Sequence, residues 1–180
     1  MSRPTELAMT LLMTPEMANF RGNVHGGSIL KLLDQVAYAC ASRYAGYYVV
    51  TISLDQVTFK QPVHVGELVT FFSRVNYTGI TSMEIGVKVV AENVTQGLVR
   101  HTNSCYFTMV AIGDNGRPIA VPPLVPADRI SEQRCRAAAL RKQRRLELAS
   151  EYETLKHEIA DQYERFKQNQ SNWGGAGNLS

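Results

Sequence analysis

The sequence has few cysteines, and their placement argues against a disulfide scaffold. Cys40, Cys105 and Cys135 are odd in number and widely separated, whereas small disulfide-stapled proteins use an even number of cysteines. No close pair of cysteine and histidine has the spacing of a zinc site. We therefore expect reduced thiols, a cytoplasmic location and no bound metal.

Long apolar runs and a strong charge of one sign are also missing. No run approaches the roughly 20 apolar residues that a membrane-spanning helix needs. The first 17 residues contain Glu6, Pro15 and Glu16, which is unlike a signal or transit peptide. The net charge is only +3, so a nucleic-acid partner is not expected. With 180 residues, 44% of them hydrophobic, one globular domain with an appendage is predicted.

The apolar pattern changes period once near the N-terminus. Residues 5–13 read as a short strand, and residues 18–27 as a loop rich in Gly and Asn. Between Ser28 and Tyr44, apolar residues recur at helical spacing, and Gly46 suits the end of that helix. Four longer strand-like segments follow, separated by turn residues: 47–59, 67–77, 82–92 and 98–112.

This order predicts an α+β fold in which an antiparallel sheet packs on one helix. Strands joined by short turns pair antiparallel, and a single apolar helix must bury its surface against them. Because the helix is apolar on most sides, we expect the sheet to wrap around it. The same order of elements occurs in the hotdog fold, which is the fold we expect for residues 1–126.

The C-terminal part has a different composition. A proline-rich connector, residues 118–126, precedes a charged segment rich in Ala, Arg, Glu and Leu. Residues 127–168 are predicted to form an amphipathic helical extension, with apolar positions three and four residues apart that resemble a coiled-coil seam. Residues 169–180, rich in Gly and Asn, are predicted to be a disordered tail.

One short segment combines residues suited to acyl-transfer chemistry. Gly26 and Gly27 lie where the loop becomes the helix, so the backbone can approach a ligand closely. The first helical turn offers N–H groups and the positive end of the helix dipole. The N–H of Gly27 is the donor we expect to polarise a thioester carbonyl.

Asp34 lies two helical turns after Gly27, among apolar residues where a buried charge would be costly. Such a carboxylate can act as a general base on water or attack the thioester carbon, and the sequence leaves both routes open. A thiolate is a good leaving group, so a strong general acid is not needed. The GxSxG motif of serine hydrolases is absent from the sequence.

Each of these residues also has a purely structural interpretation. The glycine pair alone is typical of a tight turn, and Asp34 alone is typical of a helix residue paired with Lys31 or Arg43. His25 can shape the loop, and Asn19 can cap a turn. Their conjunction in one segment favours a catalytic site.

Several stretches of the chain resemble one enzyme family. Asn19, the run Gly22-Asn23-Val24-His25-Gly26-Gly27 and Asp34 resemble the motif of hotdog acyl-CoA thioesterases of the YciA and cytosolic acyl-CoA hydrolase type. Further similarity runs in order through about residue 125, at the segments 49–51, 57–59, 62–67, 79–83, 107–111 and 116–118.

The resemblance implies a site and an assembly. It implies that Asp34 is the catalytic carboxylate, that Asn19 of the opposite protomer joins it, that Gly27 supplies the N–H, and that Thr51 holds the water or carboxylate. It implies a double-hotdog dimer, assembled as a trimer of dimers. Coenzyme A enters as part of the acyl-CoA substrate, with no separate cofactor. Its binding residues are expected to be His25, Gly26, Lys60, Arg74, Thr81 and Ser82.

Two other functions stay open on the sequence. One is a non-catalytic acyl-CoA sensor or scaffold, against which the presence of Asn19 and Asp34 argues. The other is an acyl-thioester dehydratase, which needs a histidine paired with a carboxylate. His64 and His101 fall on sheet segments with no matching carboxylate motif, so this alternative ranks last.

Overall fold

The computed structural model describes the backbone of residues 3–173 and the side chains of residues 3–167. It divides into two compact units, Met1–Cys135 and Arg136–Ser180. The first unit contains a 3₁₀ turn, Pro15–Met17, a central helix α1, Gly26–Ala45, and five strands: β1 Glu6–Leu12, β2 Tyr48–Leu54, β3 Leu68–Thr78, β4 Ser82–Asn93 and β5 Leu98–Ile112. Helix α2, Arg129–Trp173, begins in the first unit and continues into the second.

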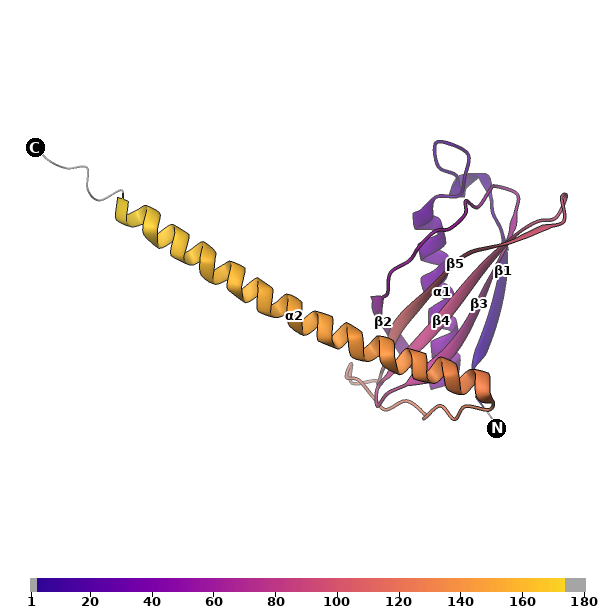
Figure 1. The fold of residues 1–180 in the computed structure, drawn as a ribbon. Helices are drawn as coiled ribbons and strands as arrows, with labels where there is room; N and C mark the ends of the chain where they lie inside the picture. Colours follow the sequence, from indigo (N-terminus) through magenta and orange to yellow (C-terminus); the bar gives the residue numbers. More distant parts are fainter. Residues whose placement is uncertain (1–2, 174–180) are drawn as a thin grey trace, which may run out of the picture. The chain divides into compact units, whose positions relative to one another are not determined.

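The five strands form one antiparallel sheet in the order β1-β3-β4-β5-β2. Strands β3, β4 and β5 follow each other directly and occupy the centre. Strand β2 pairs with β5 and β1 with β3, so these two become the edges of the sheet. Helix α1 lies along one face of the sheet and contacts all five strands (Figure 1). The predicted α+β arrangement of a sheet on a central helix is confirmed.

The core lies between α1 and the inward-facing residues of the sheet. One face of α1 is buried, including Leu33, Val36, Ala37 and Ala41. The central strands alternate, so that every second side chain meets this face; the innermost of these are Val69, Phe71, Ile85, Val89, Phe107 and Met109. The alternate side chains of the strands pack against the buried face of α1, and together they form one contiguous core.

Both ends of α1 are fixed by specific caps. His25 is the N-cap, and its Nδ1 accepts a hydrogen bond from the N–H of Gly27 at 3.0 Å. At the other end, Gly46 takes a left-handed conformation with φ 76°, which glycine adopts without steric cost. The Arg3 guanidinium donates to the carbonyls of Tyr44 and Ala45, each at 2.8 Å, where a cation also complements the helix dipole.

The expectation that α1 is apolar on most sides was wrong. Only one face is buried, while the other exposes Lys31, Asp34, Gln35 and Arg43. The small residues that suggested all-round burial, such as Ala37 and Ala41, lie on the buried face and bring the sheet close. The sheet nevertheless wraps around the buried face as predicted, because all five strands, including both edge strands, contact α1.

The strand expected over residues 47–59 ends at Leu54. A bulge lies between Thr51 and Ser53, where Ile52 is the extra residue opposite β5. Bulges bend and twist the strand that carries them, and after Leu54 the chain leaves the ladder of β5. Residues 59–63 then line a hollow beside α1 instead of extending the sheet.

The C-terminal elements differ slightly from their expected bounds. The connector 118–126 is irregular and is held by backbone bonds such as Val121 N–H to the Ile80 carbonyl at 2.9 Å. Helix α2 continues to Trp173, so residues 169–173, expected to start a disordered tail, are helical. Residues 174–180 of that expected tail lie outside the described part of the chain.

Candidate active site

The candidate catalytic carboxylate is held by a hydroxyl group. Thr51 Oγ1 donates a hydrogen bond to Asp34 Oδ1 at 2.7 Å and also lies 3.2 Å from Met109 Sδ. The bulge after Thr51 sets the direction of its side chain, and Met109 is the β5 partner of the same residue. The local kink of β2 therefore places a hydroxyl against the third turn of α1, where the sequence puts Asp34.

Asp34 is exposed in the protomer, which corrects the expectation of a buried charge. Its neighbours Leu32 and Leu33 point into the core, while the exposed Asp34 carboxylate lies beside Thr51 of the edge strand β2. An exposed carboxylate keeps its hydration and incurs no burial cost. It also stays accessible to a ligand or to another protein chain at this surface.

The loop before α1 is shaped by Asn19. Its Oδ1 accepts from the N–H of Arg21 at 2.9 Å and of Asn23 at 3.2 Å, so the structural interpretation of Asn19 as a turn cap applies in the protomer. The loop folds back on itself, because the Asn19 N–H also donates to the Asn23 carbonyl at 2.6 Å. Gly22, with φ 78°, occupies the left-handed turn position.

Asn19 and Gly26 line a hollow of about 300 Å³ beside the start of α1. Phe59, Lys60, Gln61, Pro62 and Val63 form its other wall. This hollow brings together three of the expected site residues, Asn19, Gly26 and Lys60. Asp34 and Thr51 do not line it, so in one protomer the asparagine and the aspartate belong to separate surfaces.

The N–H of Gly27 is engaged by the His25 imidazole rather than directed at solvent. Because Nδ1 accepts this bond, the ring must carry its hydrogen on Nε2. His25 is thus an N-cap of α1, a role that histidine rarely takes compared with Ser, Thr, Asp or Asn. The sequence did not indicate this contact, which only the fold of residues 25–27 creates.

The remaining expected coenzyme A residues lie apart from this hollow. Thr81 ends the turn from β3 to β4, and its carbonyl accepts from the N–H of Ala111 at 3.1 Å; Ser82 is the first residue of β4. Arg74, on β3, forms an ion pair with Glu6. None of the three lines the hollow that contains Asn19 and Lys60.

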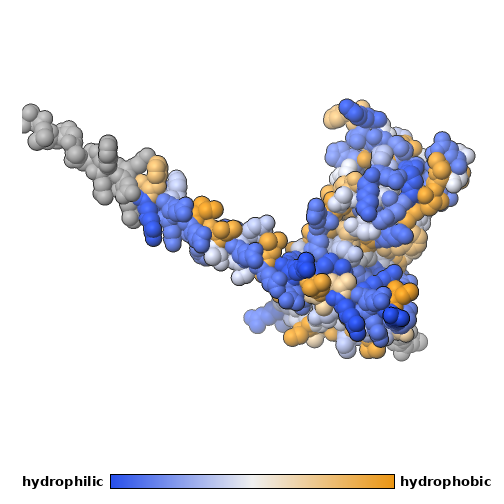
Figure 2. Space-filling view, in the orientation of Figure 1, coloured by the Kyte–Doolittle hydropathy of each residue, from blue (hydrophilic) through white to orange (hydrophobic). Residues whose placement is uncertain are grey.

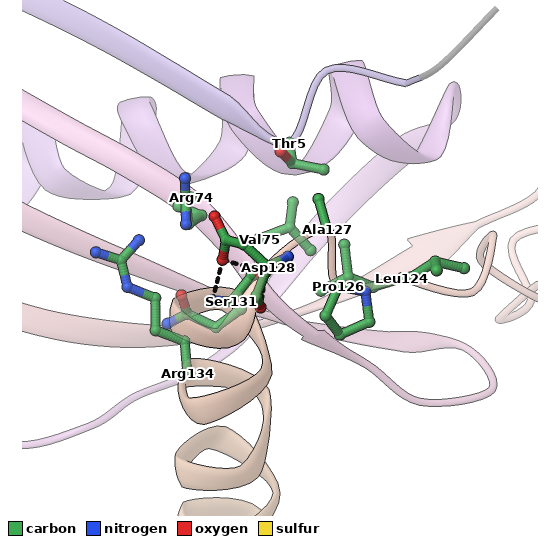
Figure 3. A pocket seen from close by; sticks show the side chains of 11 residues that line it. Thr5, Arg74, Val75, Leu124, Pro126, Ala127, Asp128, Ser131 and Arg134 are labelled. Atoms are coloured by element: carbon green, nitrogen blue, oxygen red, sulfur yellow. Dashed lines mark hydrogen bonds between the residues drawn. The ribbon is translucent and has the colours of Figure 1, made fainter.

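Arg74 lines a second hollow, of about 110 Å³, at the start of α2. Figure 3 shows Arg74, Arg134 and Asp128 gathered at one side of it. Burial lowers the pKa of the Arg74 guanidinium, and the charge of Arg134 lowers it further, whereas Asp128 opposes this shift. Asp128 Oδ1 already accepts from the N–H of Ser131 at 2.7 Å, so a carboxylate of the chain itself occupies the helix N-terminus.

A buried ion pair supports the wall of the Asn19 hollow, and sequence reasoning missed it. Arg100 Nη2 lies 2.8 Å from Glu67 Oε2, and the Glu67 side chain is 2% exposed. The same guanidinium donates to the Pro62 carbonyl at 3.1 Å, and the His64 N–H donates to Glu67 Oε2 at 2.9 Å. On the sequence, Glu67 only begins the predicted strand 67–77, because nothing in its neighbourhood indicates the distant Arg100.

The described residues contain neither a cluster that could bind a metal nor a helix that could span a membrane. Within this part of the chain, no group of three His, Cys, Asp or Glu side chains could hold a metal ion. None of its helices combines the length and the apolar character that a bilayer span requires.

Two curated relatives are similar over most of the chain. Protein VdlD of Helicobacter pylori is 47% identical over 78% of this chain and 80% of that protein. The uncharacterized acyl-CoA thioester hydrolase ZMO0511 of Zymomonas mobilis is 36% identical over 66% of this chain and 80% of that protein. The model of the thioesterase superfamily matches residues 21–98, which include Asp34 and Thr51.

The chain belongs to the thioesterase superfamily. It has the hotdog fold that the resemblance in the sequence implied, and it is similar to acyl-CoA thioester hydrolases in sequence and structure. An apo-hexameric acyl-CoA thioesterase is 33% identical, with a TM-score of 0.77, over 80% of this chain and 92% of that chain.

A second solved hydrolase has been examined with ligands and with substitutions. The acyl-CoA hydrolase of Staphylococcus aureus, in complex with butyryl coenzyme A and coenzyme A, is 28% identical, with a TM-score of 0.77, over 86% of this chain and 94% of that one. Variants of that enzyme replace an asparagine, an aspartate and a threonine by alanine. The three replaced residues are separated by 15 and 17 positions.

Proposed function

We propose that this thioesterase hydrolyses acyl-CoA with Asp34 as the reacting carboxylate, held in place by Thr51. The observation that carries the proposal is the 2.7 Å hydrogen bond from Thr51 Oγ1 to Asp34 Oδ1. It fixes one carboxylate oxygen and leaves the other for a water molecule or for the thioester carbon. Asn19, Asp34 and Thr51 are separated by 15 and 17 residues, as are the residues replaced in the S. aureus variants.

The reaction needs little more than a carbonyl donor and this carboxylate. As general base, Asp34 takes a proton from water while the water oxygen bonds to the thioester carbon. The C–S bond then breaks, and coenzyme A leaves as a thiolate that regains the proton. As nucleophile, the carboxylate bonds to the thioester carbon, the C–S bond breaks and the coenzyme A thiolate leaves; water then hydrolyses the resulting acyl anhydride to the free acid and the Asp34 carboxylate. In either route the carbonyl oxygen gains negative charge that an N–H at the α1 N-terminus stabilises.

Gly27 remains the proposed carbonyl donor, with a condition set by His25. Its N–H donates to His25 Nδ1 at 3.0 Å, so a bound thioester must replace the imidazole as acceptor or share the donor with it. His25 is accordingly proposed to shape the entrance of the site rather than to transfer a proton. Gly26 and Lys60, which line the hollow beside Asn19, are proposed to contact the acyl-CoA.

The complete site is proposed to form between two protomers. Asn19 lines the hollow at the start of α1, whereas Asp34 lies outside it and is exposed. A two-fold axis would bring Asn19 of one copy to Asp34 of the other twice in each dimer. Because a similar thioesterase is hexameric, we propose a double-hotdog dimer and a trimer of such dimers. Arg74, Thr81 and Ser82, apart from Lys60 in the protomer, are proposed to meet the nucleotide part of the substrate there.

The carboxylate is tested by Asp34→Asn, assayed by thiol release from acyl-CoAs of short, medium and long chain. We expect a loss of about 10²- to 10⁴-fold in kcat/KM, the range for removal of a catalytic acid–base group. Gln35→Ala, at the next exposed position of α1, is the matched control and should retain parent activity. A variant Asp34→Asn as active as the control would refute the assignment.

The shared site is tested by mixing two inactive chains. When Asn19→Ala and Asp34→Ala chains are co-expressed, each mixed dimer contains one site with both changes and one intact site. Random pairing then restores roughly a quarter of the parent activity, because half of the dimers are mixed and half of their sites are intact. No recovery in demonstrably mixed dimers would place both residues in the site of a single protomer. Binding without thiol release by the parent would favour the sensor alternative.

A further inference from the structure

A stripe of apolar side chains runs along the second half of α2 in the unit Arg136–Ser180. We define the α2 seam as Leu148, Tyr152, Leu155, Ile159, Gln162 and Phe166. Its apolar members are between 48% and 66% exposed. Figure 2 shows such apolar side chains at intervals along the otherwise hydrophilic surface of α2. A surface of this kind needs an explanation, because water around five large apolar side chains is unfavourable.

The spacing of the α2 seam points to another helix as its occupant. Successive members are four, three, four, three and four residues apart, and this alternation of four and three is the seven-residue repeat of a left-handed coiled coil. A helix that covers a globular core usually has a broader apolar face. Here the seam is narrow, and charged residues such as Glu151, Lys156, Glu158 and Arg165 flank it.

The charges of the same segment argue against a lipid surface. Helices that lie on membranes are rich in Lys and Arg on their polar face. Between residues 147 and 167 the chain has six carboxylate side chains and three Lys or Arg side chains. An anionic membrane would repel this segment of α2. A second copy of the chain carries both signs in the same places and can match them.

We propose that the α2 seam binds the same seam of a second copy of this chain as a parallel, two-stranded coiled coil. Tyr152, Ile159 and Phe166 fall at heptad position a, and Leu148 and Leu155 at position d. In the central layers, β-branched Ile159 at a with leucine at d follows the pattern that favours two parallel strands. Gln162, the polar member at a d position, restricts the register, since only a partner glutamine at the same level satisfies its amide.

Charge pairing distinguishes the parallel from the antiparallel arrangement. In a parallel pair, position g of one helix meets position e of the next heptad on the other. Glu151 then meets Lys156 of the other copy, twice by symmetry, and no like charges meet at these positions. In an antiparallel pair with the two seams fully overlapped, Glu158 of one helix lies opposite Glu158 of the other, and Lys156 lies opposite Lys156. Both contacts bring like charges together. The parallel arrangement therefore combines full apolar burial with matched charges.

The first test is cross-linking in the full-length protein. Leu155→Cys is introduced with Cys135→Ser, and the purified protein is oxidised and run on a non-reducing gel. Cys40 and Cys105 are buried, and burial raises the pKa of the Cys105 thiol to about 12, so both stay unreactive. In a parallel pair, residues at one d position face each other within disulfide reach. We expect most chains to become linked in pairs.

The control is His157→Cys in the same Cys135→Ser chain, an exposed position on the opposite side of the helix. It should give at least 10-fold less linked product than Leu155→Cys. Equal linking by the two variants would contradict the proposal. Linking of Leu155→Cys chains only when mixed with Ile159→Cys chains would show an antiparallel pair and overturn the orientation.

A second pair of variants separates the α2 seam from the rest of the helix. Ile159→Lys added to the Leu155→Cys, Cys135→Ser chain should reduce the linked product at least 10-fold, because it places two cations inside the interface. Leu146→Lys, which changes a leucine that is 62% exposed but lies off the seam, should leave linking unchanged. Linking that persists with Ile159→Lys would show that the contact is accidental.

Discussion

Two carboxylates of the hotdog unit differ in nearly every physical respect. Asp34 is exposed on α1 and accepts a hydroxyl hydrogen bond from Thr51. Glu67, at the foot of β3, is buried, forms an ion pair with Arg100 and accepts the N–H of His64. Every oxygen contact that the structure gives Glu67 comes from the protein's own framework. Asp34 keeps an accessible oxygen, which a carboxylate needs if it is to react.

Both carboxylates nevertheless serve the same region. The Glu67–Arg100 pair holds the turn from Pro62 to Glu67, since Arg100 also donates to the Pro62 carbonyl. Val63, in that turn, accepts the N–H of Val24 at 2.8 Å, and Pro62 and Val63 line the hollow beside Asn19. Glu67 therefore positions a wall of the candidate site, while Asp34 is the candidate for contact with substrate.

The largest effect on stability should come from Glu67→Gln. The change leaves the Arg100 guanidinium without its buried anion, which we expect to lower the free energy of unfolding by about 2–3 kcal/mol. Asp34→Asn should change it by less than about 0.5 kcal/mol, as an exposed substitution. Urea unfolding at one fixed protomer concentration measures both values, because assembly contributes to apparent stability.

A double variant checks the cause of that loss. Glu67→Leu with Arg100→Met removes both charges together, so no uncompensated ion remains. It should unfold less readily than Glu67→Gln. If the double variant is instead the less stable protein, the loss comes from packing and hydrogen bonds to the turn rather than from the stranded cation.

Thr51→Val tests the hydrogen bond that orients the Asp34 carboxylate. Valine is close to threonine in shape but cannot donate to Asp34, so the carboxylate loses its orienting contact. We expect roughly a tenfold lower kcat with little change in unfolding free energy, equivalent to about 1.4 kcal/mol in the barrier. Thr51→Ser keeps the hydroxyl and should restore most of the rate. A similar rate for valine and serine would show that the hydrogen bond is dispensable.

The sequence predicted one carboxylate of this pair and not the other, for a physical reason. Asp34 lies within 15 residues of Asn19, so a loop, a glycine pair and a helical period suffice to predict its place. Glu67 and Arg100 are 33 residues apart, and they meet only because the chain leaves along β3 and returns along β4. Local sequence patterns around either residue therefore do not predict that contact.

The distinction between local patterns and distant contacts also explains which features of the fold could be predicted. The helix, the turns and the antiparallel pairing follow from local periods, and the structure confirms them. The edge positions of β1 and β2 depend on pairings across long stretches of chain. The early end of β2 depends on one extra residue, Ile52, in its pairing with β5. The exposure of Asp34 depends on which face of α1 the sheet covers. The many small residues of this helix made that face hard to predict from the sequence.

The final distinction between the two carboxylates is their response to acid. Burial raises the pKa of the Glu67 carboxyl, but the Arg100 guanidinium and the His64 N–H outweigh it, so the pKa lies below its ordinary 4.5. A carboxyl with a lowered folded pKa stabilises the protein above its unfolded pKa, and this contribution is lost as pH falls through the folded value. The difference in unfolding free energy between the parent and Glu67→Gln should thus be constant from pH 7 to about 5 and shrink below about 4.

Unfolding of both proteins across this pH range measures the difference, with Asp34→Asn as the comparison. A gap that stays unchanged to acid pH would mean that the charge of Glu67 does not produce the effect, and that the turn depends on the neutral hydrogen bonds alone.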